Sequence, residues 1–213
     1  MRCLILLLAV LFLIPMAQVQ AQENKKLTKE DLTPEDLALL EQDLSGVLRG
    51  FVWGLPPTVI LENERGTFMG EEEGALLYLD YISGIKSTIA YEFNDNKFWK
   101  ARVFVEKKYR DPQDQIRDLM LIAQDLTNRF GEPIQQEFNW RDETEKNFPD
   151  NWGWALYRSE LFIRMAWQND ETIVMATAGA ERQYDPELIV TYIDRATNER
   201  QQRELDENPL QLP

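Results

Sequence analysis

Strand patterns follow one another closely between residues 75 and 106, and they restrict the fold more than any other feature of the chain. Residues 75–82 are rich in β-forming side chains, and apolar and polar side chains alternate through residues 85–93. The turns between them, Ser83-Gly84 and Asn94-Asp95-Asn96, contain residue types that tolerate positive φ. Residues 97–106 close the meander, with Trp99 on the face expected to be buried. Connections this short join antiparallel neighbours, so the stretch predicts an antiparallel sheet.

Two long helix patterns frame this meander. Thr33-Pro34-Glu35-Asp36 combines an N-cap residue, a first-turn proline and an acid three residues after the cap, and it predicts a helix that Gly50 ends. After the meander, Asp111-Pro112 begins a second helix and Gly131 ends it. The apolar stripe of this second helix has three- and four-residue spacing and comprises Ile116, Leu119, Ala123, Leu126 and Phe130.

Shorter elements complete the prediction. Residues 51–54 are expected to be extended, and Pro56-Pro57 predicts a short helix through Leu61. A second set of strands follows the long helix, with Asn169-Asp170 as a tight turn and an acidic loop between Trp140 and Trp152. The predicted strands of this set are residues 134–140, 161–168, 172–178 and 188–193.

This order of elements predicts an α+β fold, in which antiparallel β-sheet has a helix before each strand set. Residues 33–195 are expected to form a single domain. A duplication of an αβββ unit, with halves at residues 33–110 and 111–195, stays open as an alternative. We expect residues 22–32 to be a flexible N-terminal segment and residues 196–213 to be a polar C-terminal tail, frayed or weakly helical.

The first 21 residues have the features of a cleaved signal peptide. Arg2 supplies the positive charge, residues 4–14 are an unbroken apolar run, and Val19 and Ala21 place small residues before the cleavage point. The apolar run has eleven residues, whereas a membrane-spanning helix needs roughly 20. Cys3 precedes the run, so it does not fit lipidation. The sequence therefore predicts export to a periplasmic or extracellular space, without stable membrane insertion after cleavage.

Composition excludes many kinds of chemistry. The chain has no histidine, and its single cysteine, Cys3, lies in the leader. The mature chain therefore cannot build a thiolate nucleophile, an imidazole base, a thiolate or imidazole metal site, or a disulfide. The mature chain keeps 37 acidic against 22 basic residues, a formal charge of −15. Such a surface is a poor partner for nucleic acid, and no cofactor motif is present.

Carboxylates are the residue type that could still carry catalysis. The candidate acids could serve a carboxylate-based hydrolase acting on cell-wall polymer, in which one acid holds a proton and another is the base or nucleophile. Glu92 and Asp80, on adjacent predicted strands, would matter only if both faced inward. Calcium is a second use for such oxygens, at Asn94-Asp95-Asn96 or in the acidic loop. The candidate acids are Glu71, Glu72, Glu73, Asp80, Glu92, Asp142, Glu143 and Glu145.

Tryptophan is abundant for this length, with six residues. Four of them, Trp140, Trp152, Trp154 and Trp167, lie around the acidic loop and the strands after it. They could stack on sugars or anchor a partner protein, although packing in the core is the more common role of such residues. Trp167 shares a predicted strand face with apolar side chains and is expected to pack. Trp140 and Trp152 are the candidates for binding.

Several motifs in a fixed order are shared with a known family of proteins. They are Phe51-Val52-Trp53-Gly54, Glu62, the hairpin at residues 89–98, Phe130-Gly131-Glu132-Pro133, and Trp152-Gly153 leading to Trp167 and Thr172-Ile173. Over roughly residues 50–193 the chain resembles a family of small exported bacterial proteins of uncharacterised function. That family places a Ser or Thr helix cap where this chain has Pro56. The resemblance implies an α+β envelope protein and supplies no activity, ligand or catalytic residue.

The sequence favours a non-catalytic binding or accessory protein that contacts another envelope protein. This expectation depends mainly on the missing catalytic and cofactor motifs and on the export signal. No catalytic, cofactor, metal or binding residue is assigned. The alternative that stays open is the carboxylate-based hydrolase of cell-wall polymer. An apolar patch of several hundred Å² would favour the binding protein, whereas two inward-facing acids in a groove would favour the enzyme.

Overall fold

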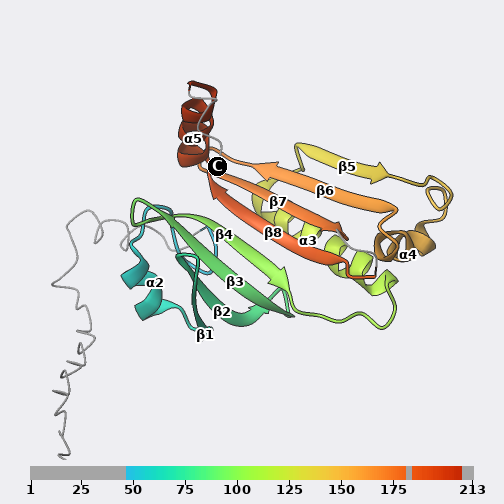
Figure 1. The fold of residues 1–213 in the computed structure, drawn as a ribbon, viewed down its shortest axis with the longest axis horizontal. Coiled ribbons are helices and arrows are strands. Elements are labelled where there is room, and N and C mark those ends of the chain that lie inside the picture. Colours follow the sequence, from blue (N-terminus) through green and yellow to red (C-terminus); the bar gives the residue numbers. More distant parts are fainter. Residues whose placement is uncertain (1–46, 181–183, 208–213) are drawn as a thin grey trace, which may run out of the picture.

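The computed structural model describes residues 47–180 and 184–207 (Figure 1). The predicted leader at residues 1–21, the segment at residues 22–32 and most of the helix predicted from Thr33 lie outside the described residues. One eight-stranded sheet organises the rest, in the order β1-β2-β3-β4-β8-β7-β6-β5, and every neighbouring pair is antiparallel. The predicted α+β class is therefore confirmed.

The first half of the sheet is a four-stranded meander. It comprises β1 (Thr67–Glu72), β2 (Ala75–Ile82), β3 (Ile85–Asn94) and β4 (Lys97–Val105). Strands β2, β3 and β4 confirm the predicted strands, whereas β1 was not predicted. This half therefore has four strands, one more than the αβββ unit allows. Every residue of β1 is exposed or half-buried, so its sequence lacks the alternation that identifies a strand. Its register also shifts between Phe68 and Gly70, where a β-bulge interrupts the pairing.

The three hairpins of this meander have two-residue turns with positive φ at both positions. They occur at Glu73-Gly74 (51° and 78°), Ser83-Gly84 (49° and 77°) and Asp95-Asn96 (50° and 61°). This geometry matches the right-handed twist of the strands and is the reason such turns select Gly, Asn and Asp. The last two turns confirm the prediction.

The second half is also a four-stranded meander, made of β5 (Gln135–Trp140), β6 (Leu161–Gln168), β7 (Thr172–Gly179) and β8 (Glu187–Asp194). All four strands were predicted to within a residue or two. The halves join through their last strands, β4 and β8, where Val103 lies opposite Val190. A single cluster of buried apolar side chains runs across both halves on one face of the sheet.

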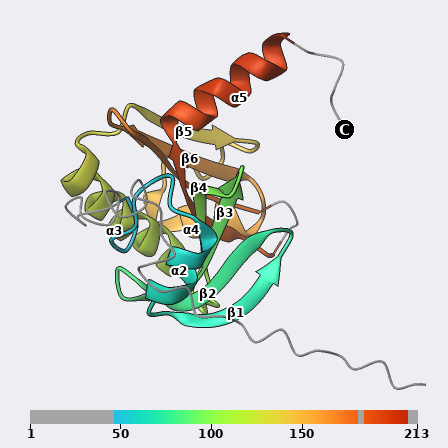
Figure 2. The ribbon, with the colours of Figure 1, turned by 90° about the vertical axis from the view of Figure 1, so that its left-hand side faces the viewer.

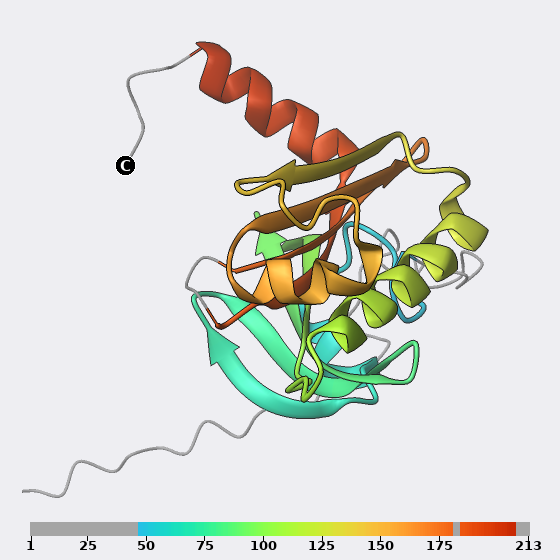
Figure 3. The ribbon, with the colours of Figure 1, turned by 90° about the vertical axis from the view of Figure 1, so that its right-hand side faces the viewer.

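Helices cover this buried face, which we call the core face. They are α2 (Pro57–Asn63), α3 (Gln113–Phe130), a 3₁₀ turn η2 (Pro149–Asn151) and α4 (Trp152–Tyr157). Figure 3 shows α3 and α4 side by side in front of the strands. The predicted stripe of α3 is confirmed, because Ile116, Leu119, Ala123 and Leu126 are buried. The helix ends at Gly131 with a φ of 84°, as predicted. The short helix at Pro57 is also confirmed, whereas α4 was missed.

Two predictions near the ends of the described chain need correction. The helix predicted up to Gly50 does not reach that residue, because Arg49 and Gly50 form a turn with φ of 55° and 88°. The segment predicted to be extended after it contains a second turn at Trp53-Gly54. At the other end, α5 (Arg195–Glu207) is a continuous helix that projects from the sheet (Figure 2), in the region predicted to be a frayed or weakly helical tail. Within the described residues, no helix is long and apolar enough to cross a bilayer.

Candidate functional site

The sheet face opposite the core, which we call the open face, carries no helix from the described residues. Strand geometry places alternate side chains on this face. In the middle of the sheet, Phe104 lies opposite Ile189, which in turn lies opposite Thr177. A sheet face turned to water is usually dominated by polar side chains, so the apolar content of this one is unusual. Its half-buried apolar side chains are Leu77, Leu79, Phe104, Ile173, Met175 and Ile189.

A groove of about 310 Å³ lies on the open face across β2, β3 and β4. Apolar side chains form much of its wall, among them Leu77, Phe93, Trp99 and Phe104. Trp99 reaches this wall through a β-bulge, because Glu92 pairs with Lys100 while Phe93 pairs with Phe98, which leaves Trp99 as the extra residue. The prediction that Trp99 faces the core is therefore wrong, and the fully buried Phe98 takes the core position.

Three of the candidate acids, Glu72, Glu73 and Glu92, line the same groove. Glu92 contacts two cations: Lys100 Nζ lies 3.1 Å from its Oε2, and Arg102 Nε lies 2.5 Å from its Oε1. Glu72 and Glu73 are exposed to solvent. A glycoside hydrolase needs one carboxylic acid whose surroundings retain its proton. In this groove one acid is paired with two cations, and the other two acids are exposed.

The remaining candidate acids lie elsewhere. Glu71 is exposed on the edge strand β1. Asp80 lies opposite Ser87 on the core face, whereas Glu92 belongs to the open face, so these two acids do not form an inward-facing pair. In the acidic loop, Asp142 Oδ1 accepts hydrogen bonds from Thr144 N (2.9 Å) and Thr144 Oγ1 (2.6 Å). These bonds hold the pKa of Asp142 below its usual value.

The calcium hypothesis gains no geometric support. Asp95 and Asn96 form a hairpin turn, and Glu145 Oε2 accepts a 2.7 Å hydrogen bond from Asn151. Across residues 47–180 and 184–207, no group of three or more carboxylate, histidine or cysteine side chains is placed to hold a metal ion. The turn chemistry accounts for these Asn and Asp residues.

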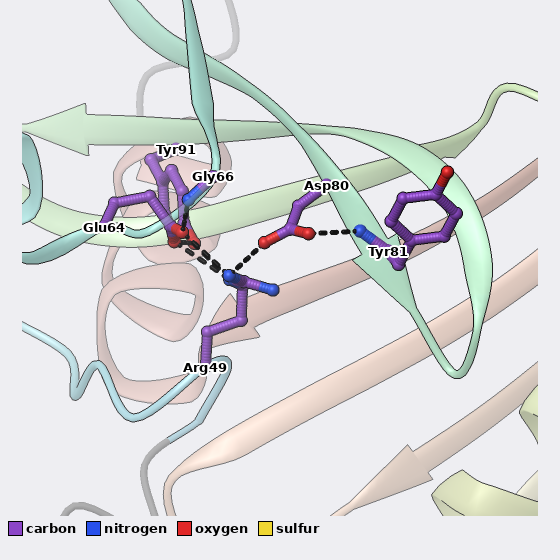
Figure 4. Close-up of polar contacts among 6 residues, drawn as sticks. All are labelled: Arg49, Glu64, Gly66, Asp80, Tyr81 and Tyr91. Atoms are coloured by element: carbon purple, nitrogen blue, oxygen red, sulfur yellow. Dashed lines mark hydrogen bonds and ion pairs between the residues drawn. The ribbon is translucent and has the colours of Figure 1, made fainter.

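A buried ionic network, missed by the sequence reasoning, joins the first described residues to the sheet (Figure 4). The carboxylate of Glu64 is 1% exposed, and Arg49 Nε lies 3.1 Å from both of its oxygens. Tyr91 donates its hydroxyl proton to Glu64 Oε2, and Gly66 N donates to Oε1 at 2.7 Å. A second carboxylate, Asp80, also contacts Arg49. The network therefore connects the Arg49 turn, the end of α2 and strands β2 and β3.

The surroundings of this network fix the protonation of its neighbours. Burial, the charge of Glu64 and the hydrogen bond to it raise the pKa of Tyr91 far above its usual value. Burial and the same charge also raise the pKa of Tyr78. Burial lowers the pKa of Arg49, but the hydrogen bond to Glu64 and the charges of Glu64 and Asp80 outweigh it and raise the value overall. Because the Glu64 side chain is only 1% exposed, this network connects elements inside the fold and offers no open site.

The tryptophans divide into packing and exposed residues. Trp167 is fully buried, as predicted, and its indole N–H donates to Thr127 Oγ1 at 3.1 Å. Trp140 and Trp152 are half-buried and pack edge to face, with ring centroids 5.8 Å apart. The indole N–H of Trp152 also donates to Lys146 O at 3.2 Å. Trp140 and Trp152 thus hold the acidic loop against β5, and both keep part of their surface exposed. Trp154, in contrast, is 46% exposed.

Sequence reasoning could have found only part of this arrangement. Glu64 stands two residues after Glu62, which was singled out, but nothing in the sequence indicates that its side chain is buried. Lys100 and Arg102 lie on the open face beside Glu92, and only the strand pairing brings these three residues together. Comparison of the chain with protein-family models, curated proteins and solved structures finds no match. The geometry of the open face is therefore the main guide to function.

Proposed function

We propose that this protein is a non-catalytic binding protein and that a partner protein docks on the open face of its sheet. The observation that carries the proposal is the row of half-buried apolar side chains across the uncovered face, in which Phe104 lies opposite Ile189. Domains usually cover apolar sheet faces with a second layer. A partner protein would supply that layer, and partly exposed apolar surface of this kind is typical of protein contacts.

The groove at one end of the face adds specific anchor points. Trp99 and Phe104 offer the aromatic surface that dominates the binding energy of many protein interfaces. Arg102 and Lys100, held by Glu92, offer hydrogen-bond donors at the rim. The net charge of −14 for the whole chain argues against nucleic acid as the occupant.

The place of action in this proposal is the cell envelope. Support for export comes from the signal-peptide features of residues 1–21 and from the resemblance to small exported bacterial proteins. The partner class is accordingly another envelope protein. A cell-wall hydrolase is the weaker candidate, because Glu92 is paired with two cations and Glu72 and Glu73 are exposed, so these acids form no inward-facing pair in the groove.

Site-specific photo-crosslinking in the native envelope tests the proposal. A photoreactive phenylalanine analogue would replace Thr191, which lies at the centre of the open face between Arg102 and Met175. The matched position is Leu121 on α3, which is 45% exposed on the helix side of the molecule. We expect one discrete protein adduct from position 191 and none of that size from position 121.

A second variant makes the result specific. Phe104→Glu places a charge in the apolar row and should abolish the adduct from position 191, while Leu121→Glu should leave it unchanged. Circular dichroism would verify that both variants fold. An adduct that survives Phe104→Glu, or that forms equally from both positions, would refute docking on the open face.

A further inference from the structure

A second groove lies on the helix side of the molecule, away from the open face. It is formed by the segment after β4, the first turn of α3, the end of α4 and the residues before β8. Its volume is about 330 Å³, which falls within the range of roughly 300–1,000 Å³ typical of small-molecule sites. Three tyrosines line it, Tyr109, Tyr157 and Tyr184, together with Gln115.

Gln115 has an unusual position in this groove. The residue is fully buried, and its Nε2 donates a hydrogen bond to Pro186 O at 3.3 Å. Its Oε1 has no hydrogen-bond partner within the part of the chain that the structure describes. This oxygen has no accessible surface, so Gln115 belongs to the floor of the groove, and the polar contacts of a ligand would come from the exposed side chains around it.

Aromatic rings continue from the groove onto the surface. Tyr157 and Tyr184 lie with ring centroids 5.1 Å apart, and Trp154 meets Tyr157 edge to face at 5.9 Å. Tyr184 is 60% exposed although it is a large aromatic residue. Its backbone has a φ of 72°, a conformation that bulky residues rarely adopt, and its N–H donates to Tyr157 O at 2.7 Å. The backbone thus presents the ring of Tyr184 to solvent next to the groove.

The charges around the groove nearly balance. Lys107 is engaged with Asp118, at 2.6 Å between Nζ and Oδ2. Lys108 and Asp185 are exposed and have no ion-pair partner among the described residues. Burial and the charge of Asp118 raise the pKa of the Tyr109 hydroxyl, so it remains protonated at neutral pH. The groove therefore offers hydrogen-bond donors and acceptors without a strong charge of either sign.

We propose that this groove binds a saccharide, with Tyr184 stacking on a sugar ring and the exposed Lys108 and Asp185 forming hydrogen bonds with sugar hydroxyls. Sugar rings have apolar C–H faces that pack on aromatic side chains, and each hydroxyl is both donor and acceptor. Such a ligand matches the combination of exposed rings, exposed hydrogen-bonding groups and balanced charge. A strongly anionic ligand would meet Asp185, and a purely apolar one would desolvate Lys108 and Asp185 without giving them partners.

Titration of the protein with chitotriose, cellotriose and maltotriose, followed by NMR, tests this proposal. We expect at least one of the three to shift the side-chain amide signals of Gln115 and the backbone signals of Tyr157 and Tyr184 in a saturable manner. If none of the three produces saturable shifts up to 10-millimolar concentration, on the order of the weakest affinities of small-molecule sites, the saccharide proposal is wrong.

Three variants distinguish binding in the groove from non-specific stacking on exposed aromatic rings. Tyr184→Ala should weaken binding at least about tenfold, a loss of about 1.4 kcal/mol, whereas Tyr184→Phe keeps the ring and should bind within about twofold of the wild type. Tyr81→Ala is the matched control, because Tyr81 is 63% exposed but lies on β2, outside the groove. Equal effects of Tyr184→Ala and Tyr81→Ala would overturn the assignment. Because this groove lies outside the open face, its result is independent of the crosslinking result.

Discussion

Replacement of Glu64 by glutamine tests whether the buried ionic network stabilises the fold. The substitution keeps the shape of the side chain and removes its charge. In the wild type, the carboxylate accepts hydrogen bonds from Arg49, Tyr91 and Gly66, and it is 1% exposed. The amide nitrogen of glutamine carries two N–H donors in place of an acceptor oxygen. These donors would face Arg49, Tyr91 and Gly66, which are themselves donors.

The expected cost follows from these contacts. Hydrogen bonds to a charged group contribute about 1.5–3 kcal/mol each. Glu64→Gln weakens the bonds from Arg49 and Tyr91, and Tyr91 is fully buried, so its hydroxyl has no access to water as a substitute. Arg49 is 20% exposed and keeps Asp80 as a partner, which reduces the loss. We therefore expect the free energy of unfolding to fall by about 3 kcal/mol.

Urea denaturation followed by tryptophan fluorescence would measure the change. Asp80→Asn is the matched control inside the network: its side chain is 28% exposed, so we expect a loss of about 1 kcal/mol. Glu199→Gln is the control outside it, because the pair with Arg195 on α5 is exposed and should contribute at most about 0.5 kcal/mol. If Glu64→Gln costs no more than Asp80→Asn, burial of the carboxylate is not the source of stability and the reasoning fails.

Two further predictions concern packing and pH. In Gly153→Ala, the new Cβ would lie 2.3 Å from the backbone carbon of Pro112, which cannot move aside, so we expect a loss of roughly 2–4 kcal/mol in urea denaturation. In Gly179→Ala the Cβ would meet only the ring of Phe162, which is 37% exposed and can rotate, so a loss as large as that of Gly153→Ala would contradict this account. Burial raises the pKa of Tyr192 to about 12; the folded state thus retains a proton that the unfolded state loses near pH 10, and this residue alone should contribute a fall in stability of about 3 kcal/mol between pH 10 and pH 12, in addition to the falls from Tyr78, Tyr91 and Tyr109. Tyr192→Phe should therefore make the decline in alkaline denaturation curves shallower without abolishing it, and an unchanged slope would show that Tyr192 is not responsible for its share.

Local sequence patterns predicted most of the strands and the long helix. An abundance of β-forming residues identified β2, and alternation identified β3. Gly, Asn and Asp marked two of the three turns of the first meander, because these residues accept positive φ at low cost. The stripe from Ile116 to Leu126 identified α3 for a comparable reason, since its spacing matches one helix face. The missed β1 has no buried face, so the period of two that marks a strand is absent.

The candidate sites were much less predictable. Trp99 was assigned to the wrong face because a bulge shifts the alternation by one residue, and bulges leave no clear mark in a single sequence. Each of the two grooves is also lined by residues that are far apart in the chain. In one groove Gln115 donates a hydrogen bond to Pro186 O, and in the other Leu77 and Phe104 lie in the same wall. No spacing rule connects such positions, because their proximity depends on which strands become neighbours.

The sequence by itself determined the α+β class, the antiparallel hairpins and the lack of histidine and cysteine chemistry in residues 22–213. These properties follow from residue type and from periodicities of two or 3.6 residues, which are local. The tertiary structure alone decided that β4 pairs with β8, that the described helices α2, α3 and α4 pack on one face and leave the other open, and that Glu64 is buried against Arg49. The reason is physical: strand order and burial depend on the free energy of the whole packed core, to which distant segments contribute together.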